Sequence, residues 1–182
     1  AYAAGGAAAL SVLTDGPFFK GSAADLQAAR RACNLPLLRK DFILDKLQIA
    51  MTAATKASAL LLIARMCSSA QDLAELQQAA MFHGLDAVVE VFDQADLDMA
   101  RQAKARIIQV NNRDLDTLTT NLDISARLIE SRSPEELWIS ASGITEPAHL
   151  ARVRELGFDA ALIGTFLMQG NDPGKALADL VK

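Results

Sequence analysis

AVVEVFD, at Ala87–Asp93, is a short valine-rich run with one carboxylate, Glu90, in its middle. The run lacks the alternation of apolar and polar residues that marks a half-exposed strand, so it fits a parallel strand covered on both faces. Before it lies a segment whose apolar residues Leu73, Leu76 and Ala80 recur at helical spacing. A buried strand beside an amphipathic helix is the basic unit of α/β folds.

The same unit recurs along the whole chain, with strand starts spaced by roughly 20–30 residues, the size of a βα unit. The predicted strands are Ala9–Leu13, Leu35–Arg39, Leu60–Ile63, Ala87–Val91, Arg106–Val110, Leu137–Ile139 and Ala160–Ile163. A doubly wound sheet would carry a glycine fingerprint after its first strand, and the sequence has none there. We therefore predict an α/β fold of the (β/α)8 TIM-barrel class, with about seven of its eight βα units present.

The length of the chain agrees with this strand count. Its 182 residues fall short of the roughly 250 that a complete barrel takes. We expect residues 1–182 to form a single, partial barrel domain in which the first strand and an N-terminal extension are absent. Such a domain exposes two strand edges, so we expect self-association, and weak or no activity of the chain by itself.

The composition is that of a soluble globular protein. Hydrophobic residues make up 51% of the chain, enough apolar side chain to exclude disorder. The net charge of −4 and the scattered basic residues argue against a nucleic acid or a membrane as partner. Only two cysteines, Cys33 and Cys67, are present, which favours neither a disulfide framework nor a metal site. Without a signal peptide, the sequence predicts a cytoplasmic protein.

Two charged residues are candidates for acid–base chemistry, because barrel active sites lie at the C-terminal ends of the strands. Glu90 stands among valines, where burial would raise its pKa toward a range useful for proton transfer. A barrel-interior ion pair is the alternative role for this carboxylate. Lys40 could polarise a carbonyl oxygen or simply reach solvent at the rim. Its side chain should share the inward parity of Leu38, which places Arg39 on the opposite face.

Glycines after the last two predicted strands indicate an anion site. Gly143 would let the backbone approach a ligand, and Gly164 with Thr165 would open a short helix whose N–H groups can face phosphate. Loops after the last two barrel strands commonly hold phosphate, although a lone glycine there is often only a turn. Arg113, after the fifth predicted strand, could bind the same anion or form a surface salt bridge with Asp114 or Asp116.

Aromatic residues also follow predicted strands on the side of the candidate site. Phe18, Phe19 and Phe42 are as compatible with an aromatic-binding pocket as with core packing. His149, before the last predicted strand, is expected to have a surface role.

Several segments follow one another in an order that carries a family resemblance. They are SVLTD (Ser11–Asp15), FFKGS (Phe18–Ser22), LPLLRKDF (Leu35–Phe42), VVEVFD (Val88–Asp93), NNRDL (Asn111–Leu115), SGI (Ser142–Ile144) and IGTFLM (Ile163–Met168). In order and spacing, over essentially the whole chain, they resemble the indole-3-glycerol phosphate synthase family. The specific part of the resemblance consists of RKDF, NNRDL and the glutamate-bearing strand. Related phosphate-binding barrels share only the glycines that follow the last two strands.

The resemblance implies a lyase of the tryptophan pathway on a (β/α)8 barrel. Its phosphorylated substrate would be 1-(2-carboxyphenylamino)-1-deoxyribulose 5-phosphate, which closes to an indole with loss of carbon dioxide and water, using neither a metal nor an organic cofactor. The roles implied for this sequence are Lys40 as general acid, Glu90 as base, Asn111 and Ser142 as orienting groups, Arg113, Gly143, Gly164 and Thr165 at the phosphate, and Phe19, Phe42 and Leu115 around the anthranilate ring.

Departures from the family pattern define the alternatives. The family has an earlier strand with a further catalytic lysine, and it usually reads Glu-Ser-Gly where Ala141 precedes Ser142 and Gly143 here. Thr165 stands where serine is common. These differences make a non-catalytic, phosphate-binding or assembly barrel the alternative function. Phosphoribosylanthranilate isomerase is the nearest enzymatic rival, but the Cys/Asp pair that it needs has no place at the strand ends.

Overall fold

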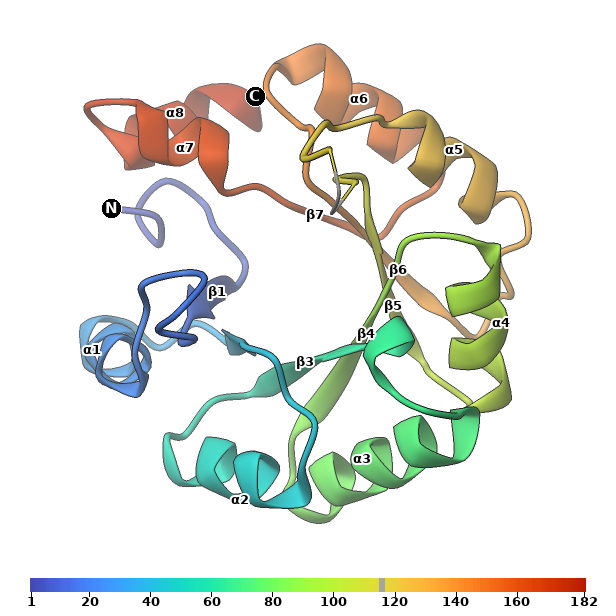
Figure 1. Cartoon of the computed structure of the whole chain (residues 1–182). Coiled ribbons are helices and arrows are strands. Elements are labelled where there is room, and N and C mark those ends of the chain that lie inside the picture. The colour runs from blue at the N-terminus through green and yellow to red at the C-terminus, as the bar shows by residue number, and fades with distance from the viewer. Residues whose placement is uncertain (115–116) are drawn as a thin grey trace. The chain divides into compact units, whose positions relative to one another are not determined.

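A computed structural model describes residues 1–114 and 117–182 of the chain, and helices alternate with strands along it (Figure 1). The elements are β1 (Leu10–Leu13), α1 (Ala23–Ala32), β2 (Leu37–Lys40), α2 (Lys46–Ala54), β3 (Ala59–Ile63), the short 3-10 helix η1 (Ala64–Met66), α3 (Ala70–Phe82), β4 (Asp86–Val91), α4 (Gln94–Gln102), β5 (Ile107–Asn111), α5 (Asp123–Ile129), β6 (Leu137–Ala141), α6 (Pro147–Glu155), β7 (Ala160–Leu162), α7 (Thr165–Gln169) and α8 (Pro173–Leu180).

The described strands form one sheet in the order of the chain, from β1 to β7. The pairs β1–β2, β2–β3, β5–β6 and β6–β7 are all parallel. In a doubly wound sheet the strand order reverses partway, whereas sequential parallel order with intervening helices is the pattern of (β/α)8 barrels. The fold class predicted from the sequence is therefore confirmed.

All the predicted strands are present, with small differences at their ends. The largest difference at a strand start is in β2, which begins at Leu37 and not at Leu35. Pro36 explains this shift, because proline has no N–H to give to a strand ladder and takes part only through its carbonyl, which accepts from the Leu10 N–H at 2.9 Å. As a result Lys40 is the last residue of β2 rather than the first residue after it.

The chain divides into two compact units, and each is described by itself. Unit 1 consists of Ala1–Ala7, Glu90–Asp98 and Arg106–Lys182, and unit 2 consists of Ala8–Val89 and Met99–Ala105. Strand β4 and helix α4 contribute residues to both units. The expectation of a single domain over the whole chain stays a prediction.

In unit 2, helices α1, α2 and α3 cover one face of β1, β2 and β3 (Figure 1). Helix α1 starts where the sequence predicts, since the Ser22 side chain caps it by accepting from the Asp25 N–H. Leu26 of this helix, Leu37 of β2 and Ala57 form a buried apolar cluster. Burial of this face holds the strands in place beneath their helices.

In unit 1, helices α5 and α6 cover one face of the sheet formed by β5, β6 and β7 (Figure 1). Trp138 of β6 is fully buried and meets Phe158 edge to face, with ring centroids 6.1 Å apart. No helix among the described residues is both long enough and apolar enough to cross a membrane.

Candidate active site

Alternation along β2 sends neighbouring side chains to opposite faces of the sheet. Arg39 faces α2, where its Nη1 donates to the Gln48 carbonyl at 3.1 Å and to the Thr52 hydroxyl at 2.8 Å. Lys40 therefore points to the face away from the helices, as the parity argument predicts. The register of β1 and β2 pairs Lys40 with Leu13, at the ends of both strands.

A buried ion pair anchors the end of β2. The Asp41 carboxylate accepts from Arg39 Nη2 at 2.7 Å and from the Thr14 hydroxyl at 2.6 Å, and its second oxygen accepts from the Phe42 N–H at 2.8 Å. Burial acts to raise the pKa of Asp41, but the hydrogen bonds from Thr14 and Arg39 and the charge of Arg39 outweigh it, so this pKa lies below its ordinary value. The strand end that carries Lys40 is thus tied to Thr14, directly after β1, and to α2.

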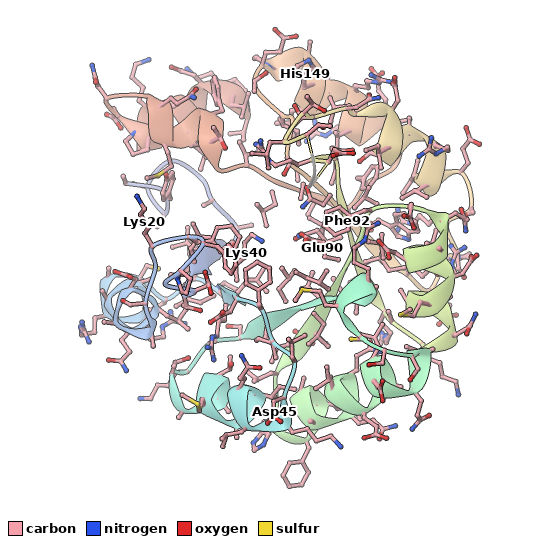
Figure 2. All side chains as sticks on the ribbon, in the orientation of Figure 1. Lys20, Lys40, Asp45, Glu90, Phe92 and His149 are labelled. Atoms are coloured by element: carbon pink, nitrogen blue, oxygen red, sulfur yellow. The ribbon has the colours of Figure 1, made fainter. Side chains whose placement is uncertain are left out.

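Lys40 and the aromatic residues come together within unit 2. The Lys40 ammonium lies over the Phe19 ring, 4.9 Å from its centroid. Phe19 and Phe42 stack with centroids 5.5 Å apart and planes 12° from parallel, and Phe18 meets Phe42 edge-on. Phe18 is 77% exposed, so core packing is the wrong interpretation for this residue. Figure 2 shows Lys40 at the end of β2 and Asp45 at the start of α2.

The loop after β1 is built to present these aromatic rings. Asp15 Oδ2 accepts from the main-chain N–H groups of Phe18, at 2.7 Å, and Phe19, at 3.3 Å. Gly21 closes the loop so tightly that a Cβ at this position would lie 2.2 Å from the Leu13 carbonyl oxygen. Only glycine allows this approach, so the loop conformation is fixed by the sequence.

In unit 1, Glu90 of β4 is buried, with 2% of its surface exposed, as the surrounding valines predict. Its Oε2 accepts a hydrogen bond of 2.6 Å from Nε2 of Gln109 on β5. Gln109 is 1% exposed. Figure 2 labels Glu90 near the end of β4, where the Phe92 N–H donates to Asp96 Oδ2 at 2.9 Å and ends the strand.

Two adjacent asparagines at the end of β5 have different environments. Asn111 is 9% exposed, and its Oδ1 accepts from the Arg113 N–H at 3.0 Å, which shapes the turn after the strand. Asn112 is fully buried toward α5, where its Oδ1 accepts from the Ser125 N–H at 3.0 Å and its Nδ2 donates to the Ser140 hydroxyl at 3.0 Å. Asn111 therefore points to the face away from α5.

The turn after β6 has an uncommon backbone. Ser142 and Gly143 both lie in the left-handed region, at φ 69° and 79°. The amide of Asn112 donates to the Ser142 carbonyl at 3.2 Å and helps to hold this conformation. A Cβ on Gly143 would come within 3.3 Å of the Thr120 side chain. A left-handed serine is strained, and such strain persists where surrounding contacts impose it.

The ends of β5, β6 and β7 are adjacent, because Asn111 pairs with Ala141 and Ala141 pairs with Leu162. Helix α7 begins at Thr165 directly after Gly164, as predicted. The short loops that follow Ala141 and Leu162 thus leave neighbouring strands at the same edge of unit 1.

Arg113 lies beside this edge in the loop after β5. Its Nη1 donates to the Leu118 carbonyl at 2.9 Å. Leu115, predicted for the anthranilate pocket, and Asp116, a predicted partner of Arg113, lie outside the described residues.

Sequence reasoning missed three contributors to the site. Gln109 could have been singled out by the logic that identified Glu90, because it is a polar residue inside an apolar strand. His149 and Arg152 line a surface cavity of about 260 Å³ together with Gly143, and no local sequence feature indicates this proximity. Figure 2 shows His149 on α6.

Comparisons with known proteins agree with these motifs. The family model for indole-3-glycerol phosphate synthase matches residues 1–180. Relatives of that name include a protein of Desulfosudis oleivorans, 43% identical over 99% of this chain and 68% of its own length, and one of Polaromonas naphthalenivorans, 42% identical over 98% and 68%. A solved 3-hexulose-6-phosphate synthase from Salmonella typhimurium has a TM-score of 0.77 at 16% identity, covering 94% of this chain and 85% of that chain. At so low an identity the likeness shows the fold alone, and that fold is the (β/α)8 barrel.

Proposed function

The chain belongs to the indole-3-glycerol phosphate synthase family, and on that premise we propose that it closes 1-(2-carboxyphenylamino)-1-deoxyribulose 5-phosphate to indole-3-glycerol phosphate in tryptophan biosynthesis. The reaction releases carbon dioxide and water, so the finer class is a carboxy-lyase. Family membership supports this activity over a non-catalytic barrel. The observation that carries the proposal is the burial of Glu90, 2% exposed on a strand of the family motif, because buried carboxylates cluster at functional sites.

Lys40 serves in this proposal as the general acid that gives a proton to the substrate ketone oxygen as the ring closes. Its neighbour Arg39 is committed to Asp41 on the helix side, whereas the Lys40 ammonium lies over the face of Phe19. The electron-rich face of an aromatic ring attracts a cation, so this contact holds the ammonium at the strand end. The stacked pair of Phe19 and Phe42 supports an aromatic subsite for the anthranilate ring.

Glu90 takes the part of the base in proton removal and dehydration. In balance, the ketone oxygen takes one proton from Lys40 as the ring closes and the carboxylate leaves as carbon dioxide. Glu90 then removes a proton from the ring carbon next to the nitrogen and returns it to the departing hydroxyl group, which leaves as water, and solvent reprotonates Lys40. Asn111 and Ser142, at adjacent strand ends, would orient substrate hydroxyls or the carboxylate. Ala141 stands where the family usually carries a glutamate before Ser142. The proton transfers in this chain would therefore use one carboxyl group fewer.

The phosphate group is assigned to the edge of unit 1 where β5, β6 and β7 end. Gly143 lines a surface cavity of about 260 Å³, and the first N–H groups of α7 follow Gly164 at Thr165. Arg113 would add a positive charge from the neighbouring loop. Leu115 belongs to the same proposal as a wall of the anthranilate pocket.

Cellular placement and assembly are further parts of the proposal. A biosynthetic enzyme of this family is expected in the cytoplasm, which cell fractionation would test. Self-association through exposed strand edges is expected to make the sedimentation coefficient rise with protein concentration. A sedimentation coefficient independent of concentration would count against that assembly.

The decisive experiment measures turnover and product binding separately. Indole formation is followed by fluorescence, and binding of indole-3-glycerol phosphate is followed by calorimetry, for the wild type, Lys40→Ala and Glu90→Gln. Each substitution is expected to lower turnover by about 10²–10⁴-fold, the usual contribution of one acid or base, while product affinity changes little. Because we expect weak activity from these residues alone, the assay is repeated after an N-terminal strand and extension are added.

Matched controls come from an exposed ion pair between α2 and α3. Lys46 and Glu75 lie 2.7 Å apart with well-exposed side chains, and such surface pairs contribute little. Lys46→Ala and Glu75→Gln should leave both turnover and binding unchanged. Product binding without turnover in either form of the protein would instead favour the non-catalytic barrel.

A further inference from the structure

Gln109 is a polar residue in the interior of β5, between the apolar residues Ile108 and Val110. Its side chain is 1% exposed and lies on the same face of the sheet as Asn111, away from α5. The amide nitrogen donates to Glu90 Oε2 at 2.6 Å. The carboxylate proposed as the base is therefore held by a neutral amide within unit 1.

The other end of this amide has no hydrogen-bond partner in the described part of the chain. Gln109 Oε1 is buried and lacks a hydrogen-bond partner among the described residues. A buried acceptor in that state is unfavourable, and such groups are rare in folded proteins. The unpaired oxygen also means that no hydrogen bond at Oε1 opposes rotation of the amide plane about its last side-chain bond.

The chemistry of an amide distinguishes it from other partners of a carboxylate. An amide carries donors on its nitrogen and an acceptor on its oxygen, whereas a lysine or arginine can only donate. An ionised carboxylate needs a donor, and a protonated carboxyl group needs an acceptor for its O–H. Rotation of the Gln109 amide would exchange its two ends and serve both forms of Glu90.

We propose that Gln109 is a positioning residue that keeps a hydrogen bond to Glu90 in both protonation states. When Glu90 is ionised, Gln109 Nε2 donates to its Oε2. When Glu90 has taken a proton from the substrate, the new O–H donates to Gln109 Oε1 after the amide has turned. Gln109 itself forms no covalent bond and gains or loses no proton. The inference rests on the proposed role of Glu90 as base.

The test uses two variants that remove the amide but keep the size of the side chain. Gln109→Met has neither donor nor acceptor, and Gln109→Glu keeps the shape but loses the N–H donor. If Gln109→Met fails to fold, the kinetics of Gln109→Glu still decide. Gln102→Met on α4 changes an exposed glutamine and serves as the matched control.

The first readout is the infrared spectrum of Glu90 in protein labelled with ¹³C-glutamate, isolated by subtracting the spectrum of Glu90→Gln. In Gln109→Met, the bands of both the ionised and the protonated carboxyl group should shift relative to wild type, because both lose a hydrogen bond. Unchanged bands for either form would overturn the two-state role. A glutamine that only donates to the ionised carboxylate would shift the band of the ionised form and leave that of the protonated form in place.

The second readout is steady-state kinetics. Both variants should lose about tenfold to a hundredfold in kcat, as expected for a misplaced catalytic group, with KM changed by less than about threefold. Loss confined to KM, or a wild-type kcat, would refute the positioning role. If the wild type forms no indole but the bands still shift in Gln109→Met, the proposed function fails and the Gln109–Glu90 pair stands, so the two failures are distinguishable.

Discussion

Replacing Asp41 with asparagine should destabilise the protein more than any surface substitution. The change keeps the side-chain size but leaves the Arg39 guanidinium, 10% exposed, without its counter-ion. Breaking one side of a buried ion pair costs about 3–5 kcal/mol. Arg39 keeps two oxygen acceptors on α2, from Gln48 and Thr52, so we expect the lower end, about 3 kcal/mol.

The effect should depend on pH in a defined direction. Hydrogen bonds and the charge of Arg39 hold the pKa of Asp41 below its ordinary value of 3.8 despite burial. A carboxyl group with a depressed pKa in the folded state stabilises fully above its unfolded pKa, and this stabilisation is lost as pH falls through the folded value. The difference in unfolding free energy between wild type and Asp41→Asn should therefore be largest near neutral pH and shrink below about pH 4.

The measurement is urea unfolding followed by circular dichroism over that pH range. A double variant, Arg39→Met with Asp41→Leu, provides the control, because replacing both partners with apolar groups removes the uncompensated charge. The double variant should be more stable than Asp41→Asn. A loss under about 1 kcal/mol in Asp41→Asn, or a double variant that is the less stable of the two, would contradict the stabilising role of Asp41 beside Arg39.

Three further predictions concern the loops of the site. Gly21→Ala should cost about 2–3 kcal/mol, since its Cβ would meet a carbonyl oxygen at 2.2 Å; thermal melts should show no comparable loss in Gly16→Ala, where the nearest atom is 3.9 Å away. Ser142→Val should destabilise by about 1–2 kcal/mol because a β-branched residue resists the left-handed region. Ser142→Gly should be tolerated, as read from fluorescence of the single tryptophan during unfolding; equal stabilities would contradict the assigned backbone. Phe19→Leu should lower kcat/KM by about threefold to tenfold through loss of the ring beneath Lys40, and unchanged kinetics would remove that contact from the mechanism.

The strands could be predicted because a strand buried on both faces needs apolar residues at nearly every position. Segments such as AVVEV and ALLLI are almost continuous apolar runs, and helical stripes separate them. Alternation along a strand is equally local, so the opposite directions of Arg39 and Lys40 followed from their adjacent positions. The start of β2 was the exception, where the missing N–H of Pro36 decided the boundary.

Contacts between distant residues could not be predicted in the same way. Asn112 holds the turn after β6 across 30 positions of sequence, and Gln109 meets Glu90 across 19. Their partners depend on the register of neighbouring strands, which a single sequence does not specify. The left-handed conformation of Ser142 has the same origin, because serine has no intrinsic preference for it.

Polar residues occur as adjacent pairs at the strand ends because neighbouring side chains of a strand point to opposite faces of the sheet. One face contacts a helix and the other faces away from it. At the end of β2, Arg39 binds α2 while Lys40 faces away from it. At the end of β5, Asn112 binds α5 while Asn111 faces away from it. Each motif therefore encodes a supporting residue beside a residue available for chemistry. Substitution of Arg39 or Asn112 should thus impair the proposed site through the position of its neighbour, even though both side chains point toward the helices.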